Sequence, residues 1–251
     1  MIGLAISQSS CKFPFYYKIH HISGTVYNME GNAIKVDYHS KRHLIIDSCN
    51  SDIDTFLRTL TLAKHGREEL EHLLTTTAKI TINISDKVGI MRKDGKYRII
   101  GGLTWLEKGK SPNLIINEPS DNWWMRAFDK DRYVWVYTES RIEIYKGSVK
   151  YANDPTMELN AENVDLLSWD RDSSLSDFSM DTIYVERFLY PEMLYKNLKE
   201  LYYFAGLHEI YHTRPKNIEI QELNGNSEID AILLEQKAFK ARKRLNKRTI
   251  R

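Results

Sequence analysis

The sequence predicts an α+β protein with a mixed sheet, and three observations support this fold class. Residues 79–84 (Lys-Ile-Thr-Ile-Asn-Ile) alternate strictly, with isoleucine on one face, as the residues of a half-buried strand do. Residues 52–74 and those after Pro191 carry apolar side chains at helical spacing instead. Turn signals such as Asp94-Gly95 separate further short apolar runs, which predicts hairpins. The chain therefore contains both strand-like and helix-like segments.

Short apolar and polar runs alternate through residues 14–49, a pattern typical of β-strands. Glu30-Gly31-Asn32 supplies a turn within this stretch. The strand candidates are residues 15–19, 33–38 and 43–47. We expect about two to four strands and treat residues 1–50 as a β-rich N-terminal segment that precedes a domain over residues 51–251.

The first helix is expected over residues 52–74, with a start signal at Ser51-Asp52. Its apolar residues recur at helical spacing, and His65-Gly66 interrupts the pattern. These residues are Ile53, Phe56, Leu57, Leu60 and Ala63, and then Leu70, Leu73 and Leu74. The spacing indicates one amphipathic face that packs on a core.

A hairpin is expected around Asp94-Gly95, between Met91 and Tyr97-Arg98-Ile99-Ile100. Gly101-Gly102 is expected to end its second strand. Residues 113–117 (Asn-Leu-Ile-Ile-Asn) predict a further strand. With residues 79–84, these strands form the sheet of the domain.

Residues 121–182 differ in character and are expected to form a β-rich aromatic insertion in the domain. Residues 133–137 and 141–145 look like the two strands of a hairpin. Residues 170–181 are acidic and rich in serine, which is typical of a loop. The tryptophans of this block are Trp123, Trp124, Trp135 and Trp169.

Two helices are expected near the C-terminus. Pro191 occupies the favoured first turn of the earlier one, and apolar residues continue at helical spacing to about Thr213. Asn224-Gly225-Asn226 then forms a turn, and Ser227 caps a last helix expected from Glu228 to Leu245.

Composition is ordinary for a globular protein, with 42% apolar and 28% charged residues in a chain of 251. A net charge of +2 gives no overall electrostatic case for nucleic acid or a membrane as partner. No apolar run reaches the roughly 18 residues of a membrane span, so we expect no transmembrane helix. Cys11 and Cys49 do not make a disulfide framework, which favours a reducing compartment.

The N-terminal residues lack the basic region and the long apolar core of a cleaved secretory signal. Residues 2–10 are uncharged and rich in serine, a composition shared by type III secretion signals and by frayed termini. We therefore expect a cytoplasmic protein, or one secreted into a host cell without a cleaved signal peptide.

The pentapeptide His208-Glu209-Ile210-Tyr211-His212 has the form H-E-x-x-H. Residues four apart share one face of a helix, so both imidazoles can point a nitrogen at one metal ion. Glu209 lies beside that face, where its carboxylate can reach a metal-bound water. The plainer alternative is two core histidines, because they continue the apolar stripe of the helix. Buried imidazoles need partners, however, and a metal supplies them.

Catalytic zinc takes three protein ligands and keeps one position for water. No histidine follows His212, which excludes a third histidine downstream. Glu228 and Glu235 lie 16 and 23 positions after His212 and can share one face of the last helix. We prefer Glu228, because it stands in the first turn, and hold Glu235 in reserve. Asp230 is a candidate to orient a histidine.

These residues predict a zinc-dependent endopeptidase that cleaves a protein or peptide substrate. Zn²⁺ is expected to lower the pKa of its water and to polarise the scissile carbonyl. Glu209 would take the proton from that water and pass it to the leaving amine. A tyrosine or arginine usually helps to stabilise the oxyanion, and Tyr202, Tyr211 and Arg214 are close in sequence.

The motif, with Glu228-Ile229-Asp230-Ala231 after it, resembles the zincin metallopeptidases whose third ligand is a glutamate on a following helix. The order of helix, strand, hairpin, strand and motif helix also resembles the upper half of zincin domains. The resemblance implies a zincin-like domain with an active-site helix and a C-terminal ligand helix. It also implies a sheet edge that pairs with the substrate, at residues 113–117 or in the hairpin at 97–103.

More narrowly, three segments beside the motif look like the NleD-type bacterial effector zinc metallopeptidases. They are Gly66-Arg67-Glu68-Glu69-Leu70, Ile80-Thr81-Ile82 and Gly101-Gly102-Leu103-Thr104. The likeness covers residues 52–118 and 205–245. Members of that family are injected into host cells and cut signalling kinases, so the resemblance implies a secreted effector with a protein substrate.

Two other functions stay open at this point. Basic residues at the end of the last helix would suit nucleic-acid binding, although a solvated helix face is the plainer interpretation. The Trp- and Tyr-rich residues 121–182 would suit a non-catalytic interaction protein with an accidental motif. The basic residues are Lys237, Lys240, Arg242, Lys243, Arg244, Lys247, Arg248 and Arg251.

Overall fold

The structure of the chain is a computed structural model that describes most of residues 21–240. The described residues are 21–39, 43–76, 78–93, 96–107, 113–116, 133–136, 139–154, 156–168, 185–186, 195–214, 228–240 and 245. The strand expected at 15–19 and the expected cap Ser227 lie outside them.

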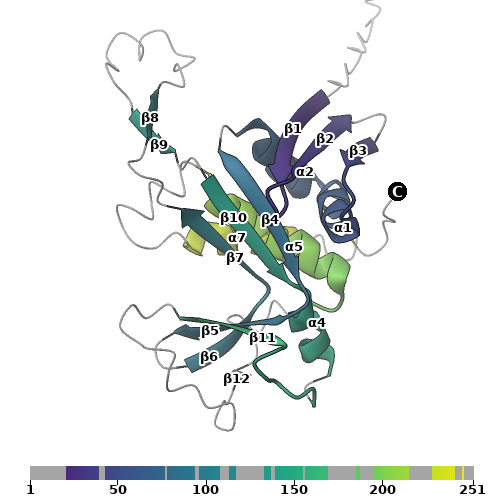
Figure 1. The fold of residues 1–251 in the computed structure, drawn as a ribbon, viewed down its shortest axis with the longest axis vertical. Coiled ribbons are helices and arrows are strands. Elements are labelled where there is room, and N and C mark those ends of the chain that lie inside the picture. Colours follow the sequence, from purple (N-terminus) through teal and green to yellow (C-terminus); the bar gives the residue numbers. More distant parts are fainter. Residues whose placement is uncertain are drawn as a thin grey trace, which may run out of the picture.

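A six-stranded mixed sheet forms the centre of the described fold, in the order β3-β2-β1-β4-β10-β7 (Figure 1). Its strands are β1 (His21–Tyr27), β2 (Ala33–His39), β3 (His43–Asp47), β4 (Lys79–Ser85), β7 (Gly102–Glu107) and β10 (Glu139–Tyr145). Strands β4 and β10 are parallel, whereas β7 is antiparallel to β10. Ile80 and Ile82 of β4 are fully buried, so the alternation in the sequence marks the core face correctly. The predicted α+β class is confirmed.

Two smaller sheets lie beside the large one. The first has the order β11-β5-β6-β12, and the second pairs β8 with β9. Their strands are β5 (Val88–Lys93), β6 (Lys96–Ile100), β8 (Asn113–Ile116), β9 (Tyr133–Val136), β11 (Val164–Ser168) and β12 (Val185–Glu186). Strands β5 and β6 pair antiparallel, as the hairpin prediction requires, and β8 confirms the strand expected at 113–117.

The expected hairpin between residues 133–137 and 141–145 is wrong. Strand β9 pairs with β8, and β10 runs between β4 and β7, where Ile142 lies opposite both Ile82 and Thr104. A period-two pattern shows which residues share a face, but it does not show which strand is the partner. Strands from the expected N-terminal segment and from the expected insertion thus pair into one sheet with β4.

The helical pattern expected over residues 52–74, with its interruption at His65-Gly66, is two helices, α1 (Ser51–Leu60) and α2 (Lys64–Thr75). The break falls between them rather than at Gly66, which lies inside α2. A Cβ at Gly66 would clash with the carbonyl oxygen of Leu60. The glycine therefore permits the close approach of the two helices instead of ending one of them.

The motif helix α5 spans Leu198–His212 and begins later than the start expected at Pro191. A pair of contacts similar to a capping box sets this start: the Asn197 side chain accepts the backbone N–H of Glu200, and the Glu200 carboxylate accepts the N–H of Lys196, the residue before the cap. Helix α5 contacts α1, α2, α7, β7 and β10, together with α4 (Lys146–Asn153). Burial from several sides explains why most of its residues are buried.

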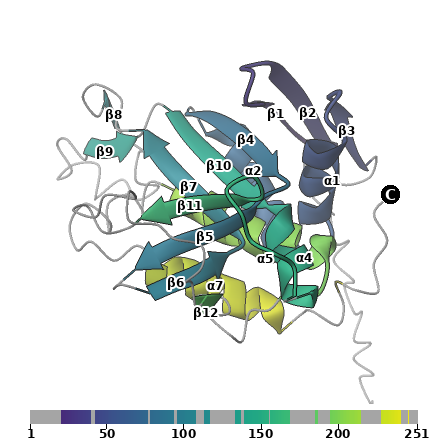
Figure 2. The same ribbon diagram turned by 60° about the horizontal axis from the view of Figure 1, so that its bottom comes forward.

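Helix α7 (Glu228–Phe239) packs along α5, as Figure 2 shows. It ends before the expected end at Leu245, with Lys240 in a turn. The ring of Phe239 stacks on Phe204 of α5, with 3.9 Å between centroids. None of the described helices has the length and apolar character needed to cross a bilayer.

Candidate metal centre

Two histidines of α5 face the same neighbour on α7. Being four apart, His208 and His212 lie one above the other, with their ring centroids 4.8 Å apart. The last turn of the helix is closed by the Thr213 hydroxyl, which donates to the carbonyl oxygen of Ile210. The motif is therefore on a helix, as predicted, and both imidazoles project from one face.

Glu228 is the carboxylate that both histidines meet. Its Oε2 lies 3.1 Å from Nε2 of His208, and its Oε1 lies 3.5 Å from Nε2 of His212. One donor atom from each of the three residues lies within 4.8 Å of the others. Two ligands of a tetrahedral zinc ion stand about 3.3 Å apart. The two nitrogens and one carboxylate thus form a donor set that fits zinc, and they are the preferred residues of the sequence prediction.

Glu235 lies behind His208 rather than between the two histidines. Its Oε2 is 3.3 Å from Nδ1 of His208, an ion-pair distance without hydrogen-bond alignment. Its Oε1 accepts a hydrogen bond of 2.9 Å from the Tyr195 hydroxyl. Glu235 therefore faces the ring nitrogen that a metal on Nε2 would leave free. Asp230, the expected orienting residue, instead adds to the effect of burial in raising the pKa of Tyr211.

Glu209 is held against strand β7. The hydroxyl of Thr104 lies 2.8 Å from the backbone carbonyl oxygen of Glu209 and 2.9 Å from its Oε2. A Cβ at Gly102 would come within 2.7 Å of Cγ of Glu209, so only glycine leaves room for this side chain. Glu209 as a residue is only 6% exposed. Its carboxyl group is thus buried beside the motif histidines of the same helix.

Burial and charge act together on the ionisable groups of the site. Burial raises the pKa of Glu209 to about 7, and the charges of Glu228 and Glu235 add to this, while His208 and the Thr104 hydrogen bond oppose it. Burial alone would lower the pKa of His208, but contacts with Glu228 and Glu235 raise it well above its usual value. Several carboxyl groups around two imidazoles make a site that a cation stabilises.

The described contacts of the expected oxyanion donors Tyr202, Tyr211 and Arg214 are with residues other than the two histidines. Tyr202 packs edge-on against Phe56 of α1, and the guanidinium of Arg214 pairs with Glu69 through two short contacts. Cζ of the same guanidinium lies over the ring of Tyr211, 5.9 Å from the ring centroid. None of these described contacts is with His208 or His212, so they do not identify the oxyanion donor.

The sheet edge nearest the site is β7. Within the described residues it pairs with β10 alone, and its Thr104 touches Glu209. Of the two edges expected from the resemblance, β8 at 113–116 belongs to the separate two-stranded sheet. The hairpin at 97–103 includes only the first residues of β7.

The residues behind the two alternative functions are mostly outside the described part of the chain. Lys237 and Lys240 are described and exposed at the end of α7, as a solvated helix face predicts. The side chain of Trp135 on β9 is not described. The undescribed residues are Trp123, Trp124, Trp169, Arg242, Lys243, Arg244, Lys247, Arg248 and Arg251.

Sequence reasoning missed Gly102, Thr104 and Tyr195 as residues of the site. Gly101-Gly102 has a recognisable signal, because two adjacent glycines beside a strand indicate close approach of another side chain. Thr104 and Tyr195 have no such signal. No family model, curated protein or solved structure matches the chain.

Proposed function

We propose that the protein is a zinc-dependent endopeptidase of the zincin type. The observation that carries this proposal is the convergence of His208, His212 and Glu228, with donor atoms within 4.8 Å of one another. Glu209 stands one residue from the first histidine, with its carboxyl group fixed by Thr104. Two nitrogens and one carboxylate that can bind the metal, with a neighbouring carboxyl group that can act as the base, are the metal ligands and the base that such hydrolysis requires.

Each residue has a defined role in the proposed reaction. His208 and His212 would hold the metal through Nε2, and Glu228 through a carboxylate oxygen. Bound zinc supplies Lewis acidity, which makes water a nucleophile near neutral pH and polarises a carbonyl group. Glu209 accepts the proton of the attacking water on a carboxylate oxygen and donates it to the nitrogen of the leaving amine. Thr104 keeps that carboxylate in place through both steps.

Strand β7 supports a substrate in extended conformation. It is the end strand of the described sheet, and it carries the residue that orients Glu209. A peptide that adds to the edge of β7 that pairs with no described strand would gain backbone hydrogen bonds without depending on a particular sequence. We therefore propose an extended protein segment as substrate, bound along β7 across the metal site. Delivery into a host cell, which the NleD-type resemblance implies, stays a prediction.

Metal analysis and hydrolysis of internally quenched peptide libraries test the proposal. The purified wild-type protein should contain about one Zn²⁺ per chain. Glu209→Gln should keep the metal and lose hydrolysis, whereas His208→Ala and His212→Ala should lose the metal. A wild-type protein without stoichiometric zinc, or a Glu209→Gln variant that hydrolyses normally, would remove the basis of the assignment.

A further inference from the structure

A chain of buried polar contacts runs from the candidate metal site into the core. The Tyr195 hydroxyl donates to Oε1 of Glu235 over 2.9 Å, and Oε2 of Glu235 lies 3.3 Å from Nδ1 of His208. Tyr195 is 6% exposed, and Glu235 is 2% exposed. We call Tyr195, Glu235 and His208 the orienting chain.

The two oxygens of Glu235 have separate tasks. Tyr195 has one hydroxyl proton, and its donation to Oε1 fixes the rotation of the carboxylate. The other oxygen is then directed at Nδ1 of His208, a buried atom that has no aligned hydrogen-bond partner among the described residues. An imidazole that binds a metal through Nε2 carries its proton on Nδ1, and that N–H requires an acceptor. Oε2 of Glu235 is the acceptor at hand.

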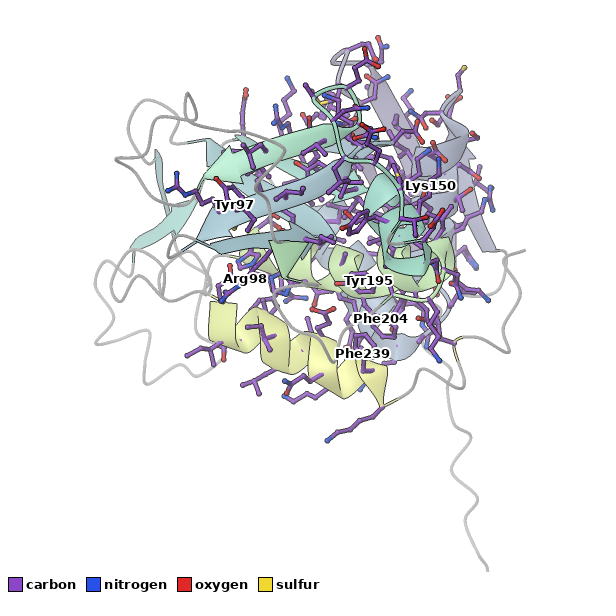
Figure 3. All side chains as sticks on the ribbon, turned by 90° about the horizontal axis from the view of Figure 1, so that it is seen from below. Tyr97, Arg98, Lys150, Tyr195, Phe204 and Phe239 are labelled. Atoms are coloured by element: carbon purple, nitrogen blue, oxygen red, sulfur yellow. The ribbon has the colours of Figure 1, made fainter. Side chains whose placement is uncertain are left out.

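Packing holds both ends of the orienting chain. A Cβ at Gly101 would come within 2.6 Å of the Tyr195 ring, so the ring packs directly on the backbone of this glycine, just before β7. The rings of Phe204 and Phe239 stack and join α5 to α7, and Figure 3 labels both of them together with Tyr195. Glu235 occupies the buried face of α7 together with Ala231 and Ala238. A side chain buried in this way has little freedom to take another rotamer.

We propose that Glu235 is a positioning residue that orients His208 for metal binding, and that Tyr195 acts through Glu235. The inference rests on the zinc site of the proposed function, but not on any hydrolytic activity. The inference gives Glu228 and Glu235 of α7 different roles. Glu228 meets Nε2 of both histidines and would bind the metal, whereas Glu235 meets Nδ1 of one histidine and would only hold its ring.

Zinc affinity measured by competition with a chromophoric chelator tests the inference on the full-length chain. Glu235→Gln should weaken zinc binding by about 10- to 100-fold, the usual cost of losing such a partner. Tyr195→Phe should cause a smaller loss, and it should add nothing when Glu235 is already Gln. Glu228→Gln should abolish stoichiometric binding.

Matched controls separate orientation from general stability. Tyr203→Phe removes another buried tyrosine hydroxyl, which accepts from the N–H of Gly66, and Glu200→Gln changes another buried glutamate, at the start of α5. Both lie away from the metal site and should keep wild-type zinc affinity, even where they lower the unfolding midpoint. Urea unfolding of all variants shows which of them remain folded.

Each outcome has a distinct meaning. Wild-type zinc affinity in folded Glu235→Gln would overturn the inference and leave the peptidase proposal intact. Complete loss of zinc, as in Glu228→Gln, would make Glu235 a ligand and would also overturn it. Zinc binding that weakens as expected, in a protein that cleaves no peptide, would support the inference and remove the proposed activity. A wild-type protein that binds no zinc would overturn both.

Discussion

The hydroxyl of Thr104 lies between the backbone carbonyl oxygen of Glu209, at 2.8 Å, and the Oε2 atom of the same residue, at 2.9 Å. A hydroxyl has one proton and can donate to only one of these oxygens at a time. It can donate to the carbonyl while its oxygen accepts a hydrogen bond from the O–H of a neutral Glu209, or it can donate to an ionised carboxylate. The same threonine therefore contacts the carboxyl group in either protonation state, and it joins strand β7 to helix α5 at the proposed base.

Thr104→Val should lower kcat by about 10- to 100-fold, because a base that moves by about 1 Å loses its alignment with the water. Valine has the shape of threonine but cannot donate, so the fold and the zinc content should not change. Thr104→Ser keeps the hydroxyl and should recover most of the activity. Steady-state kinetics with zinc analysis checks this, and a Thr104→Val variant with wild-type kcat would contradict it.

Gly102→Ala should reduce kcat more strongly than Thr104→Val. The added Cβ would come within 2.7 Å of Cγ of Glu209 and within 3.0 Å of the carbonyl oxygen of Glu143, which cannot retreat. Gly89→Ala is the control, since its Cβ would meet the ring of Tyr145 in the core. That variant should lose stability but keep kcat per folded molecule. Equal kcat in the two alanine variants would contradict a role for Gly102 in placing Glu209.

The parts of this molecule that the sequence predicts are those set by local periodicity. Helical spacing alone puts His208 and His212 on one face, and the alternation at 79–84 identifies the core face of β4. The start of α5 can also be predicted from the sequence, because Asn197 and Glu200 have the spacing of a capping box. Pro191 is a weaker signal for the start of the helix than this pair of residues.

Long-range pairing and side-chain direction set the rest. Nothing local to residues 139–145 shows that β10 lies between β4 and β7, since strand partners are fixed by contacts across the whole fold. Periodicity likewise puts Glu228 and Glu235 on one side of α7 without showing which ring nitrogen each of them meets. For the same reason Thr104, from a distant strand, could not be connected to Glu209 in advance.

Arg214→Met should lower the free energy of unfolding by about 3–5 kcal/mol at neutral pH, because it leaves the buried carboxylate of Glu69 without its partner. The guanidinium contacts both carboxylate oxygens of Glu69, at 2.8 Å and 3.0 Å. Burial already raises the pKa of Glu69, so protonation should relieve part of the loss in mildly acidic buffer. Urea unfolding at two pH values checks this, and an equal loss at both would contradict a buried, ionised Glu69.

His72 should make the stability of the metal-free chain depend on pH. Burial, and then the charge of Arg214, lower the pKa of His72 from 6.5 to about 4. The Thr213 hydroxyl donates to Ile210, so the His72 ring must donate its Nε2–H to Thr213. A depressed histidine pKa means that the unfolded chain binds more protons than the folded chain between these two values. The stabilising effect of neutral His72 is thus present above pH 6.5 and is lost as pH falls towards 4.

The loss from His72 should amount to about 3 kcal/mol across this window, at about 1.4 kcal/mol for each pKa unit. Glu69, on the same helix, acts in the opposite direction because its pKa is raised, and Arg214 keeps its charge throughout. The prediction therefore concerns the difference in stability between wild type and His72→Gln, in which the contribution of Glu69 cancels to first order.

The glutamine of the His72→Gln variant can still donate to Thr213 but cannot bind a proton. Urea unfolding of both proteins with chelator present should give curves of stability against pH that diverge above pH 4 and run parallel above pH 6.5. Parallel curves over the whole range would mean that His72 is not held neutral by its surroundings.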